Sequence, residues 1–241
     1  MNEKDLISIS EAASMLGVSI DTLRRWDKSG KLSSVKTKGG HRKYFRSQLE
    51  IFLNDLYKLA KNWVTKGTEF DPNFYCSNSA VFQARLTRMQ EMIAEVKGLS
   101  VAYPLVVAVA GEIGNNSFDH NLGNWPDTPG IFFGYDFNKK IIALADRGLG
   151  VLATLKRVKP ELNTHAEALK VAFTEIISGR SPESRGNGLK FVRKIVSENK
   201  IGLLFQTGDA ELILQKDSDI LDIRKSSESF RGCLALLTFP N

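Results

Sequence analysis

The segment GEIGNNSFDH, residues 111–120, presents acidic, amide and imidazole groups directly after an apolar run, where a core segment would be expected to continue. Its residues Glu112, Asn116 and His120 are four positions apart. On a helix, at about 100° per residue, they would project from one side and form a candidate binding site. The run 105–110 is also β-favouring, and the two glycines of the segment weaken a helix, so a strand that would scatter these groups stays an alternative.

Two glycine-containing segments further along the chain are suited to a nucleotide. Asp146 precedes Gly148 and Gly150 in DRGLG, and RGNG at 185–188 opens a helical pattern. A buried carboxylate can accept a hydrogen bond from the exocyclic amine of adenine, and glycines and a helix N-terminus favour phosphate. Taken alone, GLGVLA at 148–153 also fits a G-x-G-x-x-A dinucleotide pattern. That pattern expects its glycines early in a βαβ unit, whereas here they follow a predicted antiparallel pair.

The surrounding sequence predicts the helices and strands that would position these groups. Apolar periodicity predicts helices at 79–98 and at 165–178, and a third helix that Gly186 and Gly188 open and that runs to residue 196. Alternating or continuous apolar residues predict strands at 130–137, 139–146, 201–206, 211–215 and 233–239. The fold class predicted from this pattern is α+β.

The net charge of +6 is confined to the first quarter of the chain. Residues 1–66 hold 13 of the 33 Lys and Arg residues but 7 of the 27 Asp and Glu residues, so the remaining chain carries 20 of each sign. Such an excess suggests a polyanionic partner for that segment, with a solvated surface as the alternative. Cys76 and Cys233 lack disulfide or zinc spacing, and no apolar run approaches the roughly 20 residues that span a bilayer. A cytoplasmic location without membrane contact is therefore expected.

Residues 7–30 predict two short helices joined by a tight turn. Ser10 can cap the first helix and Ser19 the second, while Gly17 and Gly30 can end them. Two helices so joined form a helix-turn-helix, whose second helix would enter the major groove of DNA. The outward side chains of that helix would be Asp21, Thr22, Arg24, Arg25 and Lys28.

The next residues predict a hairpin, or wing, followed by a helix. Two short strands would flank the turn at 38–40, because its two glycines supply the positive φ that such a turn needs. Residues 47–63 have the apolar spacing of an amphipathic helix. The returning arm of the wing carries His41, Arg42, Lys43 and Tyr44, which would meet phosphates and the edge of the minor groove.

The succession EAASMLGVSIDTLRRWDKSGKL and TKGGHRKY resembles the winged helix-turn-helix of the MerR and excisionase group, over about the first fifth of the chain. The resemblance implies binding to double-stranded DNA, with recognition-helix contacts at Thr22, Arg24 and Arg25 and wing contacts at Arg42 and Tyr44. His41 is expected at the turn or at a phosphate rather than on a metal, because no second ligand lies near it. MerR regulators usually continue into a dimerising coiled coil, whereas here the polar stretch TKGTEFDPN is typical of a linker.

The three segments GEIGNNSFDH, DRGLG and RGNGLKFVRKIV, in this order, resemble the boxes of the GHKL superfamily of gyrase, Hsp90, histidine kinase and MutL ATPases. The resemblance covers about residues 80–241 and implies a two-layer Bergerat-type sandwich, with helices on one face of a mixed, mainly antiparallel sheet, that binds ATP and Mg²⁺. It assigns water activation to Glu112, Mg²⁺ to Asn116, the phosphates to His120, the adenine amine to Asp146, the pocket wall to Gly148 and Gly150, and the phosphate lid to Arg185, Gly186 and Gly188. Asn115 and His165 are expected to be structural.

These expectations divide the chain into a winged helix-turn-helix at 1–66, a linker at 67–79 and an ATP-binding domain at 80–241. The expected function is that of a DNA-binding regulator whose ATP-bound domain switches its assembly or its contacts with a regulatory protein; a homodimer is one such assembly. An anti-sigma-like protein serine kinase and a DNA-stimulated ATPase of a mobile-element or defence module are the alternatives. A self-phosphorylating histidine kinase is not expected, because no histidine lies on the helix before the first box.

Overall fold

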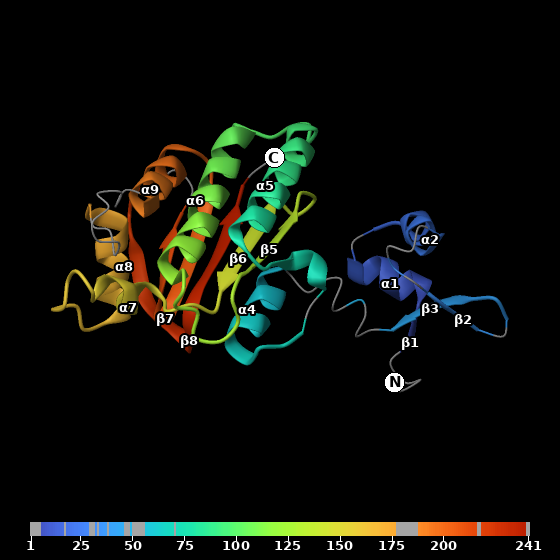
Figure 1. Cartoon of the computed structure of the whole chain (residues 1–241). Coiled ribbons are helices and arrows are strands. Elements are labelled where there is room, and N and C mark those ends of the chain that lie inside the picture. The colour runs from blue at the N-terminus through green and yellow to red at the C-terminus, as the bar shows by residue number, and fades with distance from the viewer. Residues whose placement is uncertain are drawn as a thin grey trace. The chain divides into compact units, whose positions relative to one another are not determined.

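The computed structural model of the protein divides into a first unit, Met1–Asp55, and a second unit, Leu56–Asn241 (Figure 1). The residues that it describes are 6–16, 18–28, 32, 34–37, 39–45, 49, 56–69, 71–176, 188–215 and 218–239. Each unit is built around its own hydrophobic core.

The first unit contains the predicted helix-turn-helix, formed by α1 (Ile9–Leu16) and α2 (Ile20–Lys28). The cap of α1 differs from the prediction: the Ser8 hydroxyl, rather than Ser10, accepts the Glu11 N–H at 3.2 Å, and the Glu11 carboxylate accepts the Ser8 N–H at 2.8 Å. The predicted cap of α2 is confirmed, because Ser19 Oγ accepts the Thr22 N–H at 3.1 Å. The predicted helix ends at Gly17 and Gly30 lie outside the described residues.

A three-stranded antiparallel sheet of order β1-β3-β2 completes the first unit. The predicted wing is formed by β2 (Val35–Lys36) and β3 (Arg42–Phe45), and Gly40 in its turn has a φ of 77°. The sequence did not predict β1 (Leu6–Ser8), which at three residues is too short for a period to be recognised. The buried core consists of Ala12, Ala13, Leu23, Leu32, Tyr44 and Leu49.

The second unit is built on a five-stranded antiparallel sheet of order β4-β5-β6-β8-β7. Its strands are β4 (Tyr75–Cys76), β5 (Ile131–Asp136), β6 (Ile141–Asp146), β7 (Gly202–Leu214) and β8 (Asp222–Thr238). The predictions for β5 and β6 are confirmed. Strand β7 is continuous where two strands were predicted, because the chain passes through a register shift at Gly208 without leaving the sheet.

Helices cover the face of the sheet to which Ile142 and Leu144 of β6 point (Figure 1). They are α5 (Ser79–Ala94), α6 (Tyr103–Asn121), α8 (His165–Thr174) and α9 (Gly188–Glu198), with the short α7 (Val151–Leu155) after β6. Segment 105–110 is therefore helical, and its β-favouring composition reflects the burial of Val106, Val107, Val109 and Ala110 under neighbouring elements. Among the described residues, no helix combines the length and the apolar composition needed to cross a membrane.

Helix α4 (Leu56–Lys66) lies on the opposite face of the sheet and corrects the predicted domain boundary. Its buried residues Ala60 and Trp63 share a core with Ala143, a β6 residue that alternates with Ile142. Of the predicted amphipathic helix at 47–63, residues 56–63 are helical and belong to the second unit, while most of residues 47–55 lie outside the described residues. The sequence could not assign this helix to a unit, because periodicity shows that a helix has a buried face and not what covers it. The predicted linker at 67–79 likewise contains the 3₁₀ turn η2 (Pro72–Phe74) and strand β4.

Close packing of α6 on α5 gives a test of this arrangement at Gly114. A Cβ on Gly114 would overlap the ring of Phe82, which is fully buried against Phe133. We expect Gly114→Ala to lower the free energy of unfolding by about 1–3 kcal/mol through overpacking, although alanine favours helices by about 1 kcal/mol. Urea unfolding of the full chain measures the change.

Gly111→Ala is the matched control on the same helix. Its Cβ would lie 3.0 Å from Leu86 Cδ2, the far end of a partly exposed and flexible side chain. The free energy of unfolding should change by less than about 1 kcal/mol. A Gly114→Ala variant as stable as the wild type would contradict the packing of α6 on Phe82.

Candidate functional site

Helix α6 and the first residue of α9 bring three predicted site residues together. Glu112 and Asn116 lie on neighbouring turns of α6 and are half-buried. Gly188, the first residue of α9, lies directly against them: a Cβ there would overlap Glu112 Oε1 and would lie 3.1 Å from Asn116 Nδ2. His120 follows one turn later and is also half-buried. The predicted lid residues Arg185 and Gly186 lie outside the described residues.

Asp146 reaches the same region from the end of β6. Its side chain is 2% exposed and alternates with Ala145, so it points toward α6. Ser117 Oγ, on the residue after Asn116, donates to Asp146 Oδ2 at 2.8 Å, and the Gly148 N–H donates to Oδ1 at 2.8 Å. The structure therefore places the buried carboxylate beside the turn of α6 that carries Asn116.

Burial decides the protonation of this carboxyl group. Loss of solvent raises the pKa of Asp146 to about 6, against the opposing effect of the hydrogen bonds from Gly148 and Ser117. Cys233 lies opposite Asp146 in the β6–β8 ladder. The pKa of its thiol is raised mainly by burial and, to a smaller extent, by the negative charge of Asp146. At neutral pH the site thus offers an ionised acceptor beside a protonated thiol.

Asn121 is a site residue that sequence reasoning missed. Its side chain is 3% exposed, and its Nδ2 donates to Ser117 O at 2.7 Å while its Oδ1 accepts the Leu149 N–H at 2.8 Å. A Cβ on Gly148 would overlap this amide, which explains the glycine. The available signal was that the run of polar residues continues one position beyond His120.

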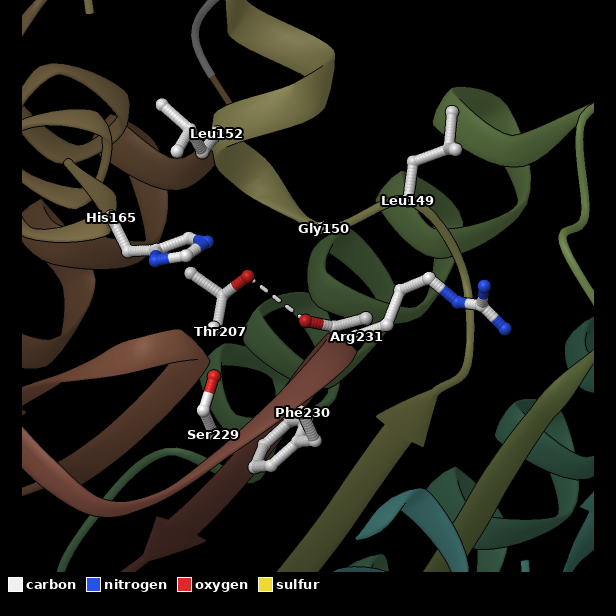
Figure 2. A pocket seen from close by; sticks show the side chains of 10 residues that line it. Leu149, Gly150, Leu152, His165, Thr207, Ser229, Phe230 and Arg231 are labelled. Carbon is white, nitrogen blue, oxygen red and sulfur yellow. Dashed lines mark hydrogen bonds between the residues drawn. The ribbon is translucent and has the colours of Figure 1, made fainter. Parts of the chain in front are cut away.

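Gly150 lies on the other side of the same loop, at a cavity of about 260 Å³ (Figure 2). With a φ of 78° it precedes α7, and the Val151 N–H donates to Thr207 Oγ1 at 3.2 Å. Thr207 Oγ1 donates in turn to Gly232 O, as the dashed line in Figure 2 shows. The lining residues are Leu149, Gly150, Leu152, His165, Thr207, Gly208, Ser229, Phe230, Arg231 and Gly232. Gly150, predicted to line the same pocket as Asp146, therefore lines this cavity, whereas Asp146 does not.

His165, expected to be structural, has a defined partner at this cavity. Its Nδ1 lies 2.7 Å from Asp209 Oδ1, and its ring packs against Gly208, where a Cβ would overlap it. The hydrogen bond to His165 lowers the pKa of the Asp209 carboxyl group. Among the described residues, no group of three or more His, Cys, Asp and Glu side chains is arranged to hold a metal ion.

In the first unit, two of the three predicted recognition-helix residues, Arg24 and Arg25, lie at the surface of α2, and Thr22 is partly exposed. Arg24 and Arg25 are exposed on α2, where Arg24 Nη1 lies 2.8 Å from Asp21 Oδ1 and Arg25 Nη2 donates to Thr22 Oγ1 at 3.3 Å. These are short-range contacts within one helix, and they leave both guanidinium groups at the surface.

The two predicted wing contacts are placed differently. Tyr44 is fully buried, and its hydroxyl donates to Leu23 O at 3.4 Å, so the prediction that it contacts DNA is wrong for this conformation. Arg42 Nε donates to Asp27 Oδ2 at 2.6 Å and lowers the pKa of that carboxyl group. Arg42 therefore ties the wing to α2. Sequence alone could not separate inward from outward residues on so short a strand.

Comparison with known proteins identifies a family for part of the first unit. Residues 8–44 match the family description "MerR family regulatory protein", so the chain carries a MerR-type helix-turn-helix DNA-binding domain at this position. The type II methyltransferase M.Eco47II of Escherichia coli is 38% identical over 73 residues. The match spans 30% of this chain and 17% of that methyltransferase.

The buried Asp146 predicts a pH dependence of stability with a definite sign. Because the pKa of Asp146 is about 6 in the folded chain and 3.8 ordinarily, the folded state keeps this proton to higher pH. The contribution of Asp146 to the free energy of unfolding therefore falls as the pH rises from about 4 to about 6, and it is constant above about pH 6. We expect the difference between wild type and Asp146→Asn to change by about 3 kcal/mol across this window, measured by urea unfolding.

Asp127→Asn is a control of opposite sign. The hydrogen bond from Arg147 lowers the pKa of Asp127, so its stabilising contribution is present above its ordinary pKa of 3.8 and is lost as the pH falls further. If the free energies of unfolding of wild type and Asp146→Asn changed in parallel between about pH 4 and pH 6, the burial of the Asp146 carboxyl group would be contradicted.

Proposed function

We propose that this DNA-binding regulator binds ATP with Mg²⁺ in its second unit and changes its assembly or its protein contacts with nucleotide state, as a GHKL-type domain would. The observation that carries the proposal is the convergence of Asp146, the Asn116 turn of α6 and the start of α9. These groups come from three distant parts of the chain, so their meeting is a property of the fold and not of a local motif.

The Asp146 carboxylate supports adenine as the base. With a pKa of about 6 it is ionised at pH 7, and the exocyclic amine of adenine can donate to it. Guanine presents a carbonyl oxygen at the corresponding position, which a carboxylate repels. The hydrogen bonds from Ser117 and Gly148 hold the carboxylate in place before any base arrives.

Asn116 and Gly188 support phosphate and Mg²⁺ beside that base. Gly188 begins an 11-residue helix, whose N-terminus favours an anion, and its lack of a side chain lets the start of that helix lie directly against Glu112 and Asn116. An amide oxygen suits Mg²⁺, which is usually held mainly by phosphates and water. Glu112 adjoins both residues and would activate water if ATP is hydrolysed.

The adenine assignment is tested by Asp146→Asn. The variant keeps the size of the side chain but turns one acceptor into a donor, so we expect ATP affinity to fall about ten- to hundredfold, the range for one lost charge-assisted hydrogen bond. Calorimetric titration of the full chain with Mg·ATP, and with Mg·GTP in parallel, measures the effect.

Asp222→Asn, at an exposed position that begins β8, is the matched control and should bind ATP like the wild type. Equal affinity of Asp146→Asn and wild type, or equal binding of ATP and GTP by the wild type, would argue against the adenine site.

The DNA-binding unit is tested by Arg24→Ala combined with Arg25→Ala. Both guanidinium groups are exposed on α2, so their removal should abolish sequence-selective binding. The slope of log affinity against log salt concentration for the residual binding should become shallower, by the equivalent of up to about two phosphate contacts. Fluorescence anisotropy with duplex DNA at several salt concentrations measures both quantities.

Lys156→Ala combined with Arg157→Ala removes the same charge from an exposed turn of the second unit and should leave DNA binding nearly unchanged. If both double variants lose affinity equally, the binding reflects net charge, and the assignment of α2 as the recognition helix is wrong.

A further inference from the structure

Arg147, between Asp146 and Gly148, joins the loop after β6 to helix α4. Its Nη1 donates to Trp63 O at 2.8 Å, and the side chain is 22% exposed. Gly67, just beyond α4, has a φ of 65°, and a Cβ there would lie 2.8 Å from Arg147 Nη1. The guanidinium group is therefore seated against the C-terminal end of α4.

This contact satisfies a specific need of the helix. Trp63 is among the last four residues of α4, whose carbonyl oxygens have no partner within the helix. Trp63 O accepts from the Gly67 N–H at 2.8 Å and also from Arg147. A cation at this position additionally favours the negative end of the helix dipole. Arg147 thus stabilises the end of α4 in two ways.

Asp127 fixes the orientation of the guanidinium group. Its Oδ2 accepts from Arg147 Nε at 3.1 Å and from Arg147 Nη2 at 2.7 Å. The same oxygen accepts from Arg231 Nη2 at 2.9 Å, so one carboxylate serves two arginines. Arg231 is the more exposed of the two arginines, and it approaches Asp127 from strand β8.

The neighbours of Arg147 belong to the proposed adenine site. The peptide bond to Asp146 joins its backbone directly to the carboxylate that would accept the base, and the Gly148 N–H holds that carboxylate at 2.8 Å. A backbone displacement at Asp146 on binding would therefore reach Arg147 directly through this peptide bond. On the other side, α4 begins at Leu56, the first residue after the DNA-binding unit.

We propose that Arg147 is a positioning residue that couples occupancy of the Asp146 loop to helix α4, and so to the affinity of the first unit for DNA. The inference rests on the proposed binding of ATP. Coupling between two sites is reciprocal, so DNA would change the affinity for ATP by the same factor as ATP changes the affinity for DNA. The typical size of such factors is about 5- to 150-fold.

The experiment measures the dissociation constant for DNA with and without saturating Mg·ATP, in the full chain. For the wild type, we expect the ratio of the two constants to differ from one by about fivefold or more. For Arg147→Gln, the ratio should approach one, while the affinity for ATP alone stays within about threefold of the wild type. Arg147→Lys, which keeps the charge but not the forked geometry, should restore part of the ratio.

Arg231→Gln is the matched control, because it removes the other guanidinium group from Asp127 without touching Trp63. It should keep the wild-type ratio. A merely structural loss at the loop after β6 would lower the affinity of Arg147→Gln for ATP alone, and the titration without DNA measures this directly.

Hydrogen exchange gives a second measurement, which uses the wild type alone and therefore does not require any variant to fold. Amides near the end of α4 should exchange more slowly, or faster, once Mg·ATP is bound; unchanged exchange there overturns the inference. A wild type that binds ATP with a DNA ratio of one, or Arg147→Gln with the wild-type ratio, overturns the coupling and leaves ATP binding intact. A wild type that does not bind ATP overturns both proposals.

Discussion

The second unit depends on how one buried carboxylate is satisfied. A charge removed from water must be hydrogen-bonded or neutralised, and Asp146 accepts from the Ser117 hydroxyl and the Gly148 N–H. These two bonds fasten the end of β6 to the middle of α6, and they turn the following loop back on itself. Asn121 repeats the fastening one turn later through Leu149. The loop geometry follows from these bonds, and so does the need for glycine at 148.

The end of β6 also serves as the junction between the two faces of the sheet. Asp146 points toward α6, whereas the next side chain, Arg147, reaches α4, which lies on the opposite face. Two neighbouring residues with opposite charge and opposite direction therefore link the helices that the sheet separates. Alternation of side chains along a strand makes such a link available at a strand end, where the chain is free to turn.

The first unit keeps its polar side chains for two separate purposes. Arg42 and Tyr44 fasten the wing to α2 through Asp27 and Leu23, while Arg24 and Arg25 remain at the surface. The excess positive charge of the chain lies within residues 1–66, and the remainder is balanced. Three of the basic residues in this segment, Lys58, Lys61 and Lys66, lie on α4, so the first unit (10 basic and 7 acidic residues) and the second unit (23 basic and 20 acidic residues) each carry a net charge of +3. Attraction to a polyanion therefore comes from both units, and in the first unit the exposed Arg24 and Arg25 lie on the recognition helix.

Local patterns in the sequence were sufficient for the elements whose signal lies within a few residues: the helix-turn-helix, the Gly40 turn, strands β5 and β6, and the order of the polar segments around Asp146. The sequence did not decide whether 105–110 is a helix, where α4 packs, that β8 begins at Asp222, or that Tyr44 is buried. Each of these depends on a partner distant in the chain, and periodicity records that a face is buried without recording what buries it. For the same reason, the sequence identified the residue types of the site but not their contacts. Only tertiary packing decided that Asp146 contacts α6 and that Arg147 contacts α4.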